Sequence, residues 1–271
     1  MKVILSYDRN SKETEEDSMN PVIIRNVSIG VGMPKICVPI VGKTREEILM
    51  AAKEILNTPA ELVEWRADYF EAVFEMQKVV ALSAELREVL GDMPLLFTFR
   101  TKQEGGEKEL NPRVYAMLNQ MMIASGNIDI VDVEVFSGEK EALAIIEAAH
   151  KYRVKVVGSN HDFAKTPDKD EIVRRLCYMQ SVGVDIPKIA VMPQNKKDVL
   201  TLLSATEEMA SEYADRPIVT MSMSEIGVIS RISGATFGSA ITFGALEKTS
   251  APGQIQVGKL KNILENMNKG L

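Results

Sequence analysis

The sequence predicts an α/β protein, a (β/α)8 barrel of the TIM type preceded by an N-terminal β-hairpin. Short β-branched runs alternate with amphipathic helical segments from residue 35 onward. The predicted strands begin roughly every 23 to 35 residues, a spacing that suits βα units. The chain has 271 residues, of which 45% are hydrophobic, enough for one large barrel core. We expect residues 19–271 to form this single barrel domain, because no convincing nucleotide-binding fingerprint suggests an open doubly wound sheet.

Two segments precede the barrel strands. Residues 1–18 are predicted to be a charged leader or extension, because their second half is charged and poor in apolar side chains. The β-rich runs Val22–Ile29 and Lys35–Ile40 then flank Gly30 and Gly32, which can supply the positive φ of a turn. We expect a hairpin here that runs into the first main strand.

Eight strands and the helices between them follow from hydrophobic periodicity and β-branched runs. The predicted strands span residues 35–41, 61–68, 94–100, 128–136, 155–162, 186–192, 217–223 and 240–246. Segments long enough for crossover helices include Thr44–Asn57, Arg113–Ser125, Lys140–Lys151, Lys169–Ser181 and Lys196–Glu212.

The composition argues against several classes of partner and cofactor. The formal net charge is -6, so no global positive field exists to attract nucleic acid or an anionic membrane. No stretch approaches the roughly 18 apolar residues of a membrane span, and the N-terminus lacks a signal-peptide hydrophobic region. Cys37 and Cys177 are isolated, and the only histidines are His150 and His161, so no metal-ligand cluster is expected. We therefore expect a cytoplasmic protein without a metal or other cofactor.

Polar residues occur in the predicted strands where a barrel core should be apolar. In the strand 61–68, Val63 and Trp65 share one face, whereas Glu64 and Arg66 share the other. The apolar face must meet the helices. Glu64 and Arg66 should therefore point into the barrel.

The same alternation places further polar side chains inside the barrel on the strands that follow. They are Thr98 and Arg100, Asp132 and Glu134, Ser159 and His161, and Lys188. Because burying an unpaired charge is costly, such a lining persists only if the charges are paired, hydrated or used by a ligand. For a single pair, such as Glu64 with Arg66, an ion pair that merely fixes the barrel stays open. For the whole set, a functional site is favoured.

Lys188 lies in the apolar run Ile-Pro-Lys-Ile-Ala-Val-Met. A strand lysine often extends its ammonium to solvent, but an inward position beside His161 favours a buried nucleophile. An amine is nucleophilic only when unprotonated, which desolvation and neighbouring cations favour. The cations expected nearby are Arg66, Arg100 and Arg231. The iminium formed with a ketone is an electron sink, so His161 could remove a proton from the adjacent carbon while Glu104 orients the imidazole.

Six motifs, in order along the chain, resemble those of type I 3-dehydroquinate dehydratases. The resemblance runs from about Asn20 to the C-terminus, and residues 1–18 have no counterpart in it. The motifs are Glu64-Trp65-Arg66, Phe97-Thr98-Phe99-Arg100-Thr101 with Glu104-Gly105-Gly106, Ser159-Asn160-His161-Asp162-Phe163, Pro187-Lys188, Ser230-Arg231 and Ser250-Ala251-Pro252-Gly253-Gln254.

The resemblance implies a hydro-lyase that removes water from 3-dehydroquinate by syn elimination, giving 3-dehydroshikimate in the shikimate route to aromatic amino acids. It implies that Lys188 forms a Schiff base with the ring ketone and that His161, assisted by Glu104, is the general base and acid. Arg231 would pair with the substrate carboxylate through two hydrogen bonds. The other implied substrate contacts are Glu64, Arg66, Arg100, Ser250 and Gln254. A homodimer is implied, and no metal or cofactor is.

Two other functions stay open from the residues alone. A lysine in a barrel also serves aldolases that act on sugar phosphates, although Arg231 and Gln254 favour a cyclic polyol that carries a carboxylate. A barrel that binds a small acid without converting it would use His161 and Lys188 only as polar lining. The segment Thr249–Gln254 is expected to be a mobile loop that closes over the bound ligand.

Overall fold

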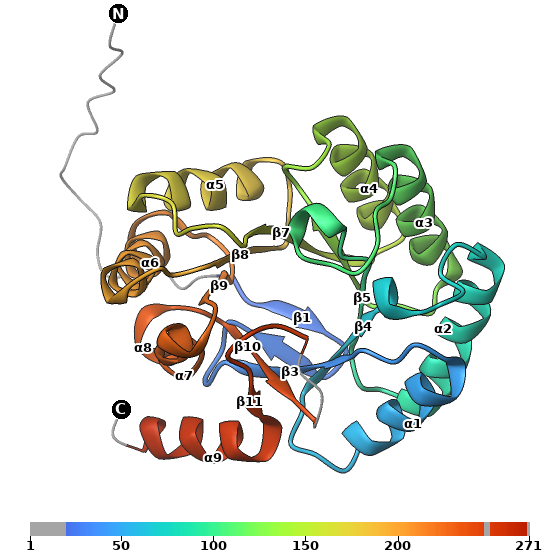
Figure 1. Ribbon diagram of the computed structural model, residues 1–271, viewed down its shortest axis with the longest axis horizontal. Coiled ribbons are helices and arrows are strands. Elements are labelled where there is room, and N and C mark those ends of the chain that lie inside the picture. Colours follow the sequence, from blue (N-terminus) through green and yellow to red (C-terminus); the bar gives the residue numbers. More distant parts are fainter. Residues whose placement is uncertain (1–19, 247–249, 270–271) are drawn as a thin grey trace, which may run out of the picture.

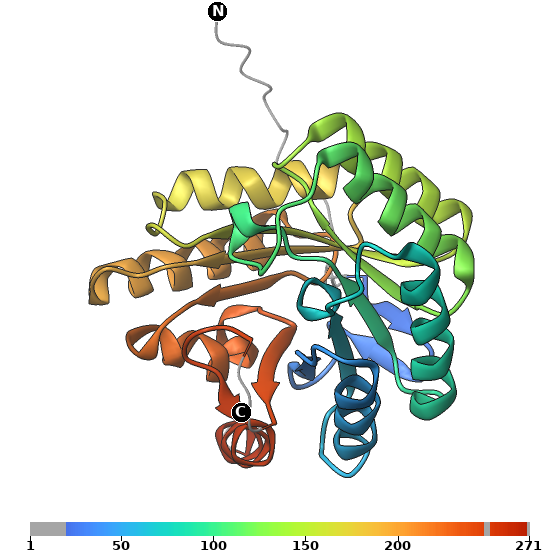
Figure 2. The same ribbon diagram turned by 45° about the vertical axis from the view of Figure 1, so that its right-hand side comes forward.

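The computed structural model describes residues 20–246 and 250–269. Parallel strands curl around a common axis, and the helices lie outside them in both views (Figures 1 and 2). All eight predicted strands are confirmed, each within its expected range. They are β3 (Lys35–Ile40), β4 (Leu62–Arg66), β5 (Leu95–Thr98), β6 (Ile130–Glu134), β7 (Lys155–Asp162), β8 (Ile186–Val191), β9 (Val219–Ser222) and β10 (Ile241–Ala245).

The barrel closes where β9 meets β10. A single parallel bridge joins Ile218 to Ser239, and the backbone N–H of Ala240 donates to the carbonyl of Ile218 at 2.8 Å. β10 in turn pairs with β3. A short extra strand, β11 (Ile255–Gln256), extends the sheet beside β10 and was not predicted. Two residues are too few to give a periodic signal.

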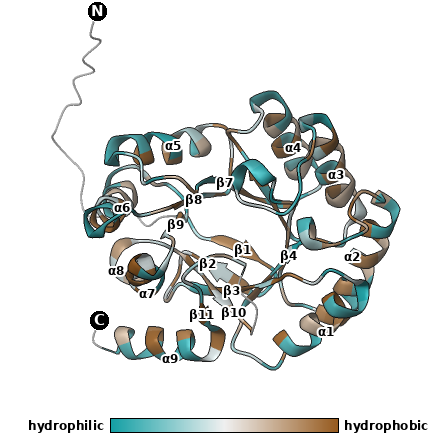
Figure 3. Ribbon diagram, in the orientation of Figure 1, coloured by the Kyte–Doolittle hydropathy of each residue, from teal (hydrophilic) through white to brown (hydrophobic). Residues whose placement is uncertain are grey.

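Helices connect the strands, as the sequence predicts. They are α1 (Arg45–Ile55), α2 (Met76–Leu90), α3 (Pro112–Ser125), α4 (Glu139–Lys151), α5 (Lys169–Ser181), α6 (Lys196–Glu208), α7 (Val228–Ile232), α8 (Gly234–Phe237) and α9 (Val257–Asn268). Four further helical turns are η1 (Ala67–Tyr69), η2 (Lys102–Glu104), η3 (Met209–Tyr213) and η4 (Glu225–Gly227). Hydrophobic and hydrophilic residues alternate along the outer helices, as one buried face requires (Figure 3). In the described part of the chain, no helix has the length and apolar character needed to cross a membrane.

The N-terminal hairpin is confirmed, but the expected position of its turn was wrong. β1 (Val22–Ile24) pairs with β2 (Val27–Ile29) in the register Val22 opposite Ile29, so the chain reverses at Arg25, whose φ is 52°. The two glycines do have positive φ, yet they lie in the link from β2 to β3. β1 is seen through the middle of the ring of strands (Figure 1). Residues 1–18, predicted as a leader, lie outside the described residues.

Strand alternation divides the buried side chains into two layers. The outer layer, which includes Trp65, Phe97 and Val133, packs against the helices. The inner layer fills the barrel floor with apolar side chains and joins them to the hairpin; it includes Leu62, Leu96, Ile130, Val157, Ile186 and, from the hairpin, Val22, Ile24 and Ile29. The predicted parity of the strands is therefore confirmed. The inward polar residues lie above this floor, toward the carboxyl ends of the strands.

Asp129, just before β6, holds the floor together. Its carboxylate accepts hydrogen bonds from Arg25 Nε at 2.6 Å, Arg87 Nη2 at 2.7 Å and the Leu95 backbone N–H at 2.8 Å. Asp129→Ala removes the acceptor shared by two partly buried donors, from Arg87 and Leu95, and by the exposed Arg25, so we expect a loss of about 2 kcal/mol in the free energy of unfolding, measured in urea. Because the amino ends of barrel strands serve stability, kcat of the folded variant should not change. Asp92→Ala removes an exposed partner of the same Arg25 and should leave stability unaltered; an equal loss would contradict the assignment.

Candidate active site

A small cavity opens at the carboxyl ends of the barrel strands, the end where active sites of this fold lie. All nine residues that the sequence singles out for catalysis or substrate binding line it. They are Glu64, Arg66, Arg100, Glu104, His161, Lys188, Arg231, Ser250 and Gln254. Met221, Met223, Phe163 and Phe243 supply apolar walls. Strands distant in sequence thus bring a lysine, a histidine and several arginines into one space.

Lys188 lies in the middle of β8 with its side chain turned into the barrel, where the residue is 4% exposed. Its Nζ is 3.7 Å from Oδ2 of Asp132 and 4.4 Å from the centroid of the Phe243 ring. Among the described residues, this carboxylate oxygen has no hydrogen-bond donor. The amine is therefore desolvated, close to one negative charge, and directed into the cavity.

His161 lies toward the end of β7, on the strand next to Lys188. Its Nδ1 is 2.9 Å from Oε2 of Glu104, and the same oxygen accepts its backbone N–H at 3.0 Å. Burial, with the positive charges of Arg100 and Lys188, holds the pKa of His161 well below its usual range. A neutral imidazole that donates from Nδ1 to Glu104 leaves Nε2 free to accept a proton.

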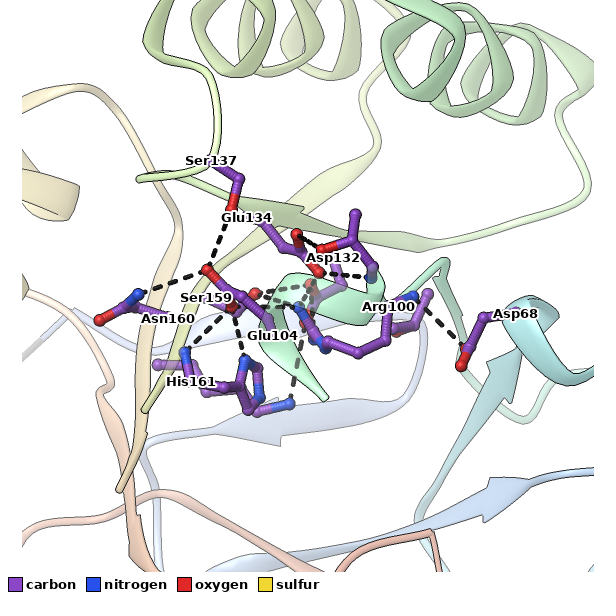
Figure 4. A network of polar contacts seen from close by, with 12 residues as sticks. Asp68, Arg100, Glu104, Asp132, Glu134, Ser137, Ser159, Asn160 and His161 are labelled. Atoms are coloured by element: carbon purple, nitrogen blue, oxygen red, sulfur yellow. Dashed lines mark hydrogen bonds and ion pairs between the residues drawn. The ribbon is translucent and has the colours of Figure 1, made fainter. Parts of the chain in front are cut away.

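Glu104 ends the turn η2 and is itself buried. Its carboxylate lies in the middle of a network of polar contacts (Figure 4). Burial, followed by the charge of Glu134, raises its pKa to about 8. The next residue, Gly105, has a φ of +83°, and a Cβ there would lie 2.1 Å from the ring of Phe163. Only glycine avoids both penalties. This turn therefore fixes how the carboxylate of Glu104 meets His161.

Arg100 lines the cavity but is already bound to buried acceptors (Figure 4). Its Nη1 donates to Glu134 Oε1 and Ser159 Oγ, both at 2.9 Å, and its Nη2 lies 2.8 Å from Asp132 Oδ1. Most of the hydrogen bonds that Arg100 forms thus belong to a structural ion-pair network, the alternative to a role in binding substrate. These contacts anchor the two inward carboxylates of Glu134 and Asp132.

Arg66 pairs with a residue that the sequence argument passed over. Its Nε and Nη2 both donate to the carboxylate of Asp68 at 2.8 Å, whereas Glu64 accepts from Thr98 Oγ1 at 2.9 Å. The salt bridge of Arg66 is therefore with Asp68, and not with Glu64 as the alternative left open by the sequence would have it. Asp68 falls within the predicted strand 61–68 but was not singled out; in the structure it belongs to η1, where its side chain meets the arginine. Arg66 Nη1 reaches the carbonyl of Ser250 at 3.5 Å.

Arg231, on the short helix α7, is buried without a carboxylate partner in the described part of the chain. Its Nη2 donates to the Pro252 carbonyl at 2.9 Å, its Nη1 lies 3.7 Å from Met221 Sδ, and its Nε has no acceptor. Burial alone lowers its pKa to about 10. A desolvated guanidinium of this kind is a site for an anion.

The segment after β10 covers the cavity from one side. Ser250 donates its backbone N–H to Gln254 Oε1 at 2.7 Å and accepts Gln254 Nε2 on its hydroxyl at 2.9 Å. The carbonyl of Ser250 accepts from Arg66, and the carbonyl of Pro252 in the same segment accepts from Arg231. Thr249, where the expected closing loop begins, lies outside the described residues.

A family model for type I 3-dehydroquinase matches residues 36–270. The 3-dehydroquinate dehydratase of Clostridioides difficile (strain 630) is 52% identical over 250 residues, covering 92% of this chain and 98% of that protein. A crystal structure of type I 3-dehydroquinate dehydratase from Clostridium difficile, with covalent modified comenic acid, has a TM-score of 0.91 at 51% identity and covers 94% of this chain and all, 100%, of its own. The enzyme from Enterococcus faecalis has a TM-score of 0.86 at 48% identity, covering 91% of this chain and 99% of that one.

Proposed function

Because this chain belongs to the type I 3-dehydroquinase family, we propose that Lys188 is the Schiff-base nucleophile and His161 the acid–base group of its reaction. That reaction is the dehydration of 3-dehydroquinate to 3-dehydroshikimate in the shikimate pathway. The observation that carries the assignment is that a buried lysine, a histidine–glutamate pair and an arginine without a carboxylate partner line one cavity. A ketone with a carboxylate on the same ring would meet all three.

In the first step, the amine of Lys188 adds to the ring ketone, and loss of water from the carbinolamine leaves an iminium. The positive iminium withdraws electrons from the adjacent carbon, which acidifies the proton there. The carboxylate of Asp132, 3.7 Å from Nζ, supports this step because it can balance the positive charge. Phe243 beneath the amine presents the negative face of its ring to the same charge.

In the second step, Nε2 of His161 takes the acidified proton, and the resulting enamine expels the hydroxyl group on the next carbon. The imidazolium returns its proton to that leaving hydroxyl, which departs as water. A single group that removes the proton and delivers it makes the elimination syn. Glu104 supports this role because it accepts Nδ1–H and can stabilise the imidazolium. Hydrolysis of the product iminium then frees Lys188.

Substrate orientation is proposed for the remaining residues. Arg231 would bind the carboxylate, since this guanidinium has Nε unpaired and no carboxylate beside it in the described residues. Ring hydroxyls would be held by Glu64, Arg66, Ser250 and Gln254. Arg100 would act mainly by holding Asp132 and Glu134, because its donors already serve them.

Growth of enone absorbance after addition of 3-dehydroquinate tests the proposal against both alternatives. An aldolase would instead consume a phosphorylated sugar, and a barrel that only binds would release no product. Without an enone signal from the folded protein, the dehydratase assignment would fail.

Arg231→Lys tests the carboxylate contact. A single ammonium cannot form the paired hydrogen bonds of a guanidinium. We expect KM for 3-dehydroquinate to rise about 10-fold or more, corresponding to roughly 1.4 kcal/mol of lost binding, with a smaller change in kcat. Steady-state kinetics measure both constants. Arg87→Lys, at the opposite end of the barrel, should retain the KM of the unaltered chain, and an unchanged KM in Arg231→Lys would argue for a different carboxylate site.

Organisation and location are also proposals, of which only the homodimer rests on the family resemblance. We propose that residues 19–271 act as one catalytic domain, that the enzyme is a homodimer and that it works in the cytoplasm. Sedimentation equilibrium tests the homodimer, which predicts twice the chain mass of 30.0 kDa.

A further inference from the structure

Glu104 makes two sets of contacts, and only one of them involves His161. Oε2 faces the histidine, whereas Oε1 accepts hydrogen bonds from Asn160 Nδ2 and Ser137 Oγ, each at 3.3 Å (Figure 4). Asn160 lies directly before His161 on β7 and therefore points to the other face of the strand. Adjacent residues of one strand, Asn160 and His161, thus donate hydrogen bonds to the two oxygens of the carboxylate.

Arg175 fixes the orientation of the Asn160 amide. Its Nη1 donates to Asn160 Oδ1 at 2.8 Å. Because a guanidinium can only donate, the amide oxygen must face Arg175 and the amide NH2 must face Glu104. Arg175 is held in turn by Glu171, which accepts its Nε at 2.7 Å, and by the ring of Phe136, 5.9 Å away. The two hydrogen bonds therefore run in a fixed order: Arg175 on α5 donates to Asn160, and Asn160 donates to Glu104.

The surroundings of Glu104 explain why this donor matters. Carboxylates of Glu134 and Asp132, on β6, oppose its negative charge. Arg100, from the end of β5, lies 3.6 Å away and favours that charge, as does the hydrogen bond from Asn160. The third neighbouring element is β7, which contributes His161. Glu104 must remain the hydrogen-bonding partner of this histidine.

We propose that Asn160 and Arg175 are positioning residues, which hold Glu104 ionised and correctly placed against His161 during the reaction. Neither residue need touch the substrate. The inference rests on the proposed roles of Glu104 and His161. It adds to them a support that extends from the site to the partly exposed helix α5.

The active form of the Glu104–His161 pair is a carboxylate beside a neutral imidazole, because only then can Nε2 accept a proton. The first proton added to the pair ends this form, whichever atom receives it. Any change that makes Glu104 easier to protonate should therefore cause activity to be lost at a higher pH as the pH falls.

Asn160→Asp is the sharpest test. The new carboxylate can still accept from Arg175, so the contact with α5 is kept, but it presents an oxygen instead of a donor to Glu104 Oε1. We expect kcat at neutral pH to fall on the order of tenfold or more, KM to stay within about twofold, and the acid limb of the kcat profile to move to higher pH. A purely structural role would predict an unchanged pH profile, since the ion pair with Arg175 is preserved.

Arg175→Met provides a second variant, and Arg174→Met is its matched control. Both arginines pair with Glu171 from the same helix, but in the described residues only Arg175 reaches Asn160. Arg175→Met should move the acid limb in the same direction as Asn160→Asp by a smaller amount, and Arg175→Lys should restore much of the loss. Arg174→Met should match the unaltered chain. Thermal melting checks that each variant is folded.

Glu104→Gln, measured in parallel, distinguishes a failure of the positioning proposal from a failure of the role proposed for Glu104. If Glu104→Gln loses activity while folded Asn160→Asp and Arg175→Met keep the kcat and pH profile of the unaltered chain, the positioning proposal is overturned and the proposed function stands. If Glu104→Gln itself keeps full activity, the role assigned to Glu104 fails, and the positioning proposal fails with it.

Discussion

Lys188→Met is expected to abolish turnover of 3-dehydroquinate and to remove the covalent adduct that borohydride traps. A thioether of similar length cannot form an imine, so the proton beside the ketone is not acidified. We expect kcat to fall by roughly 10⁵-fold or more, as when a nucleophile that works as a unit with its base is lost. The fold should survive, because Asp132 keeps its contacts with Arg100 and Ser159.

Mass spectrometry of proteolytic peptides measures the adduct. With the unaltered chain, substrate and borohydride together should add the reduced substrate to the peptide that contains Lys188, and neither reagent alone should do so. Lys155→Met is the control. Lys155 belongs to the neighbouring strand β7, but it lies at the opposite end of the barrel beside Asp185, so this variant should retain both adduct and turnover. An adduct on another lysine would refute the assignment of the nucleophile.

Strand alternation alone predicted much of the site, because each side chain on a barrel strand points either into the barrel or outward to the helices. Trp65 and Phe97 are apolar and must meet the helices, which forces Glu64 and Arg66 inward. The same reasoning places Lys188 beside His161 once the two strands are neighbours. Wherever the strands are regular, alternation along the sequence thus predicts which side chains point into the barrel.

Parity gives no information where the chain leaves the strands. Asp68 was included in the predicted strand 61–68, but in the structure it is the second residue of the helical turn η1, and its pairing with Arg66 depends on that turn. The hairpin turn was misplaced for a related reason: Arg25 adopts a positive φ that its residue type does not suggest, while glycines that could supply one lie five and seven residues later. Contacts made by turns depend on backbone geometry that periodicity does not encode.

The contacts behind Glu104 were equally hidden. Asn160 was visible in the motif with His161, but its role depends on an arginine from α5, fifteen residues further along the chain. Arg174 and Arg175 look alike in sequence, since both follow Glu171 at a spacing that allows an ion pair on a helix. Only the direction of the side chain distinguishes a surface ion pair from a support of the site.

His161→Ala is expected to separate imine formation from elimination. Without the imidazole, no group at this position can remove the acidified proton or return it to the leaving hydroxyl, so kcat should fall about 10³ to 10⁴-fold. The amine of Lys188 remains, so borohydride should still trap the substrate on it, although more slowly because loss of water from the carbinolamine also needs proton transfer.

The pH dependence gives this variant a second readout. Burial and Glu134 raise the pKa of Glu104, so the first proton is added to the Glu104–His161 pair at a higher pH than an ordinary carboxylate would allow. In the unaltered chain, activity should therefore fall as the pH drops through the neutral range. His161→Ala removes the base whose protonation causes this loss, and its residual rate should lack that acid limb. If the residual rate kept the limb, a different group would be the base, even if the imine on Lys188 were proved.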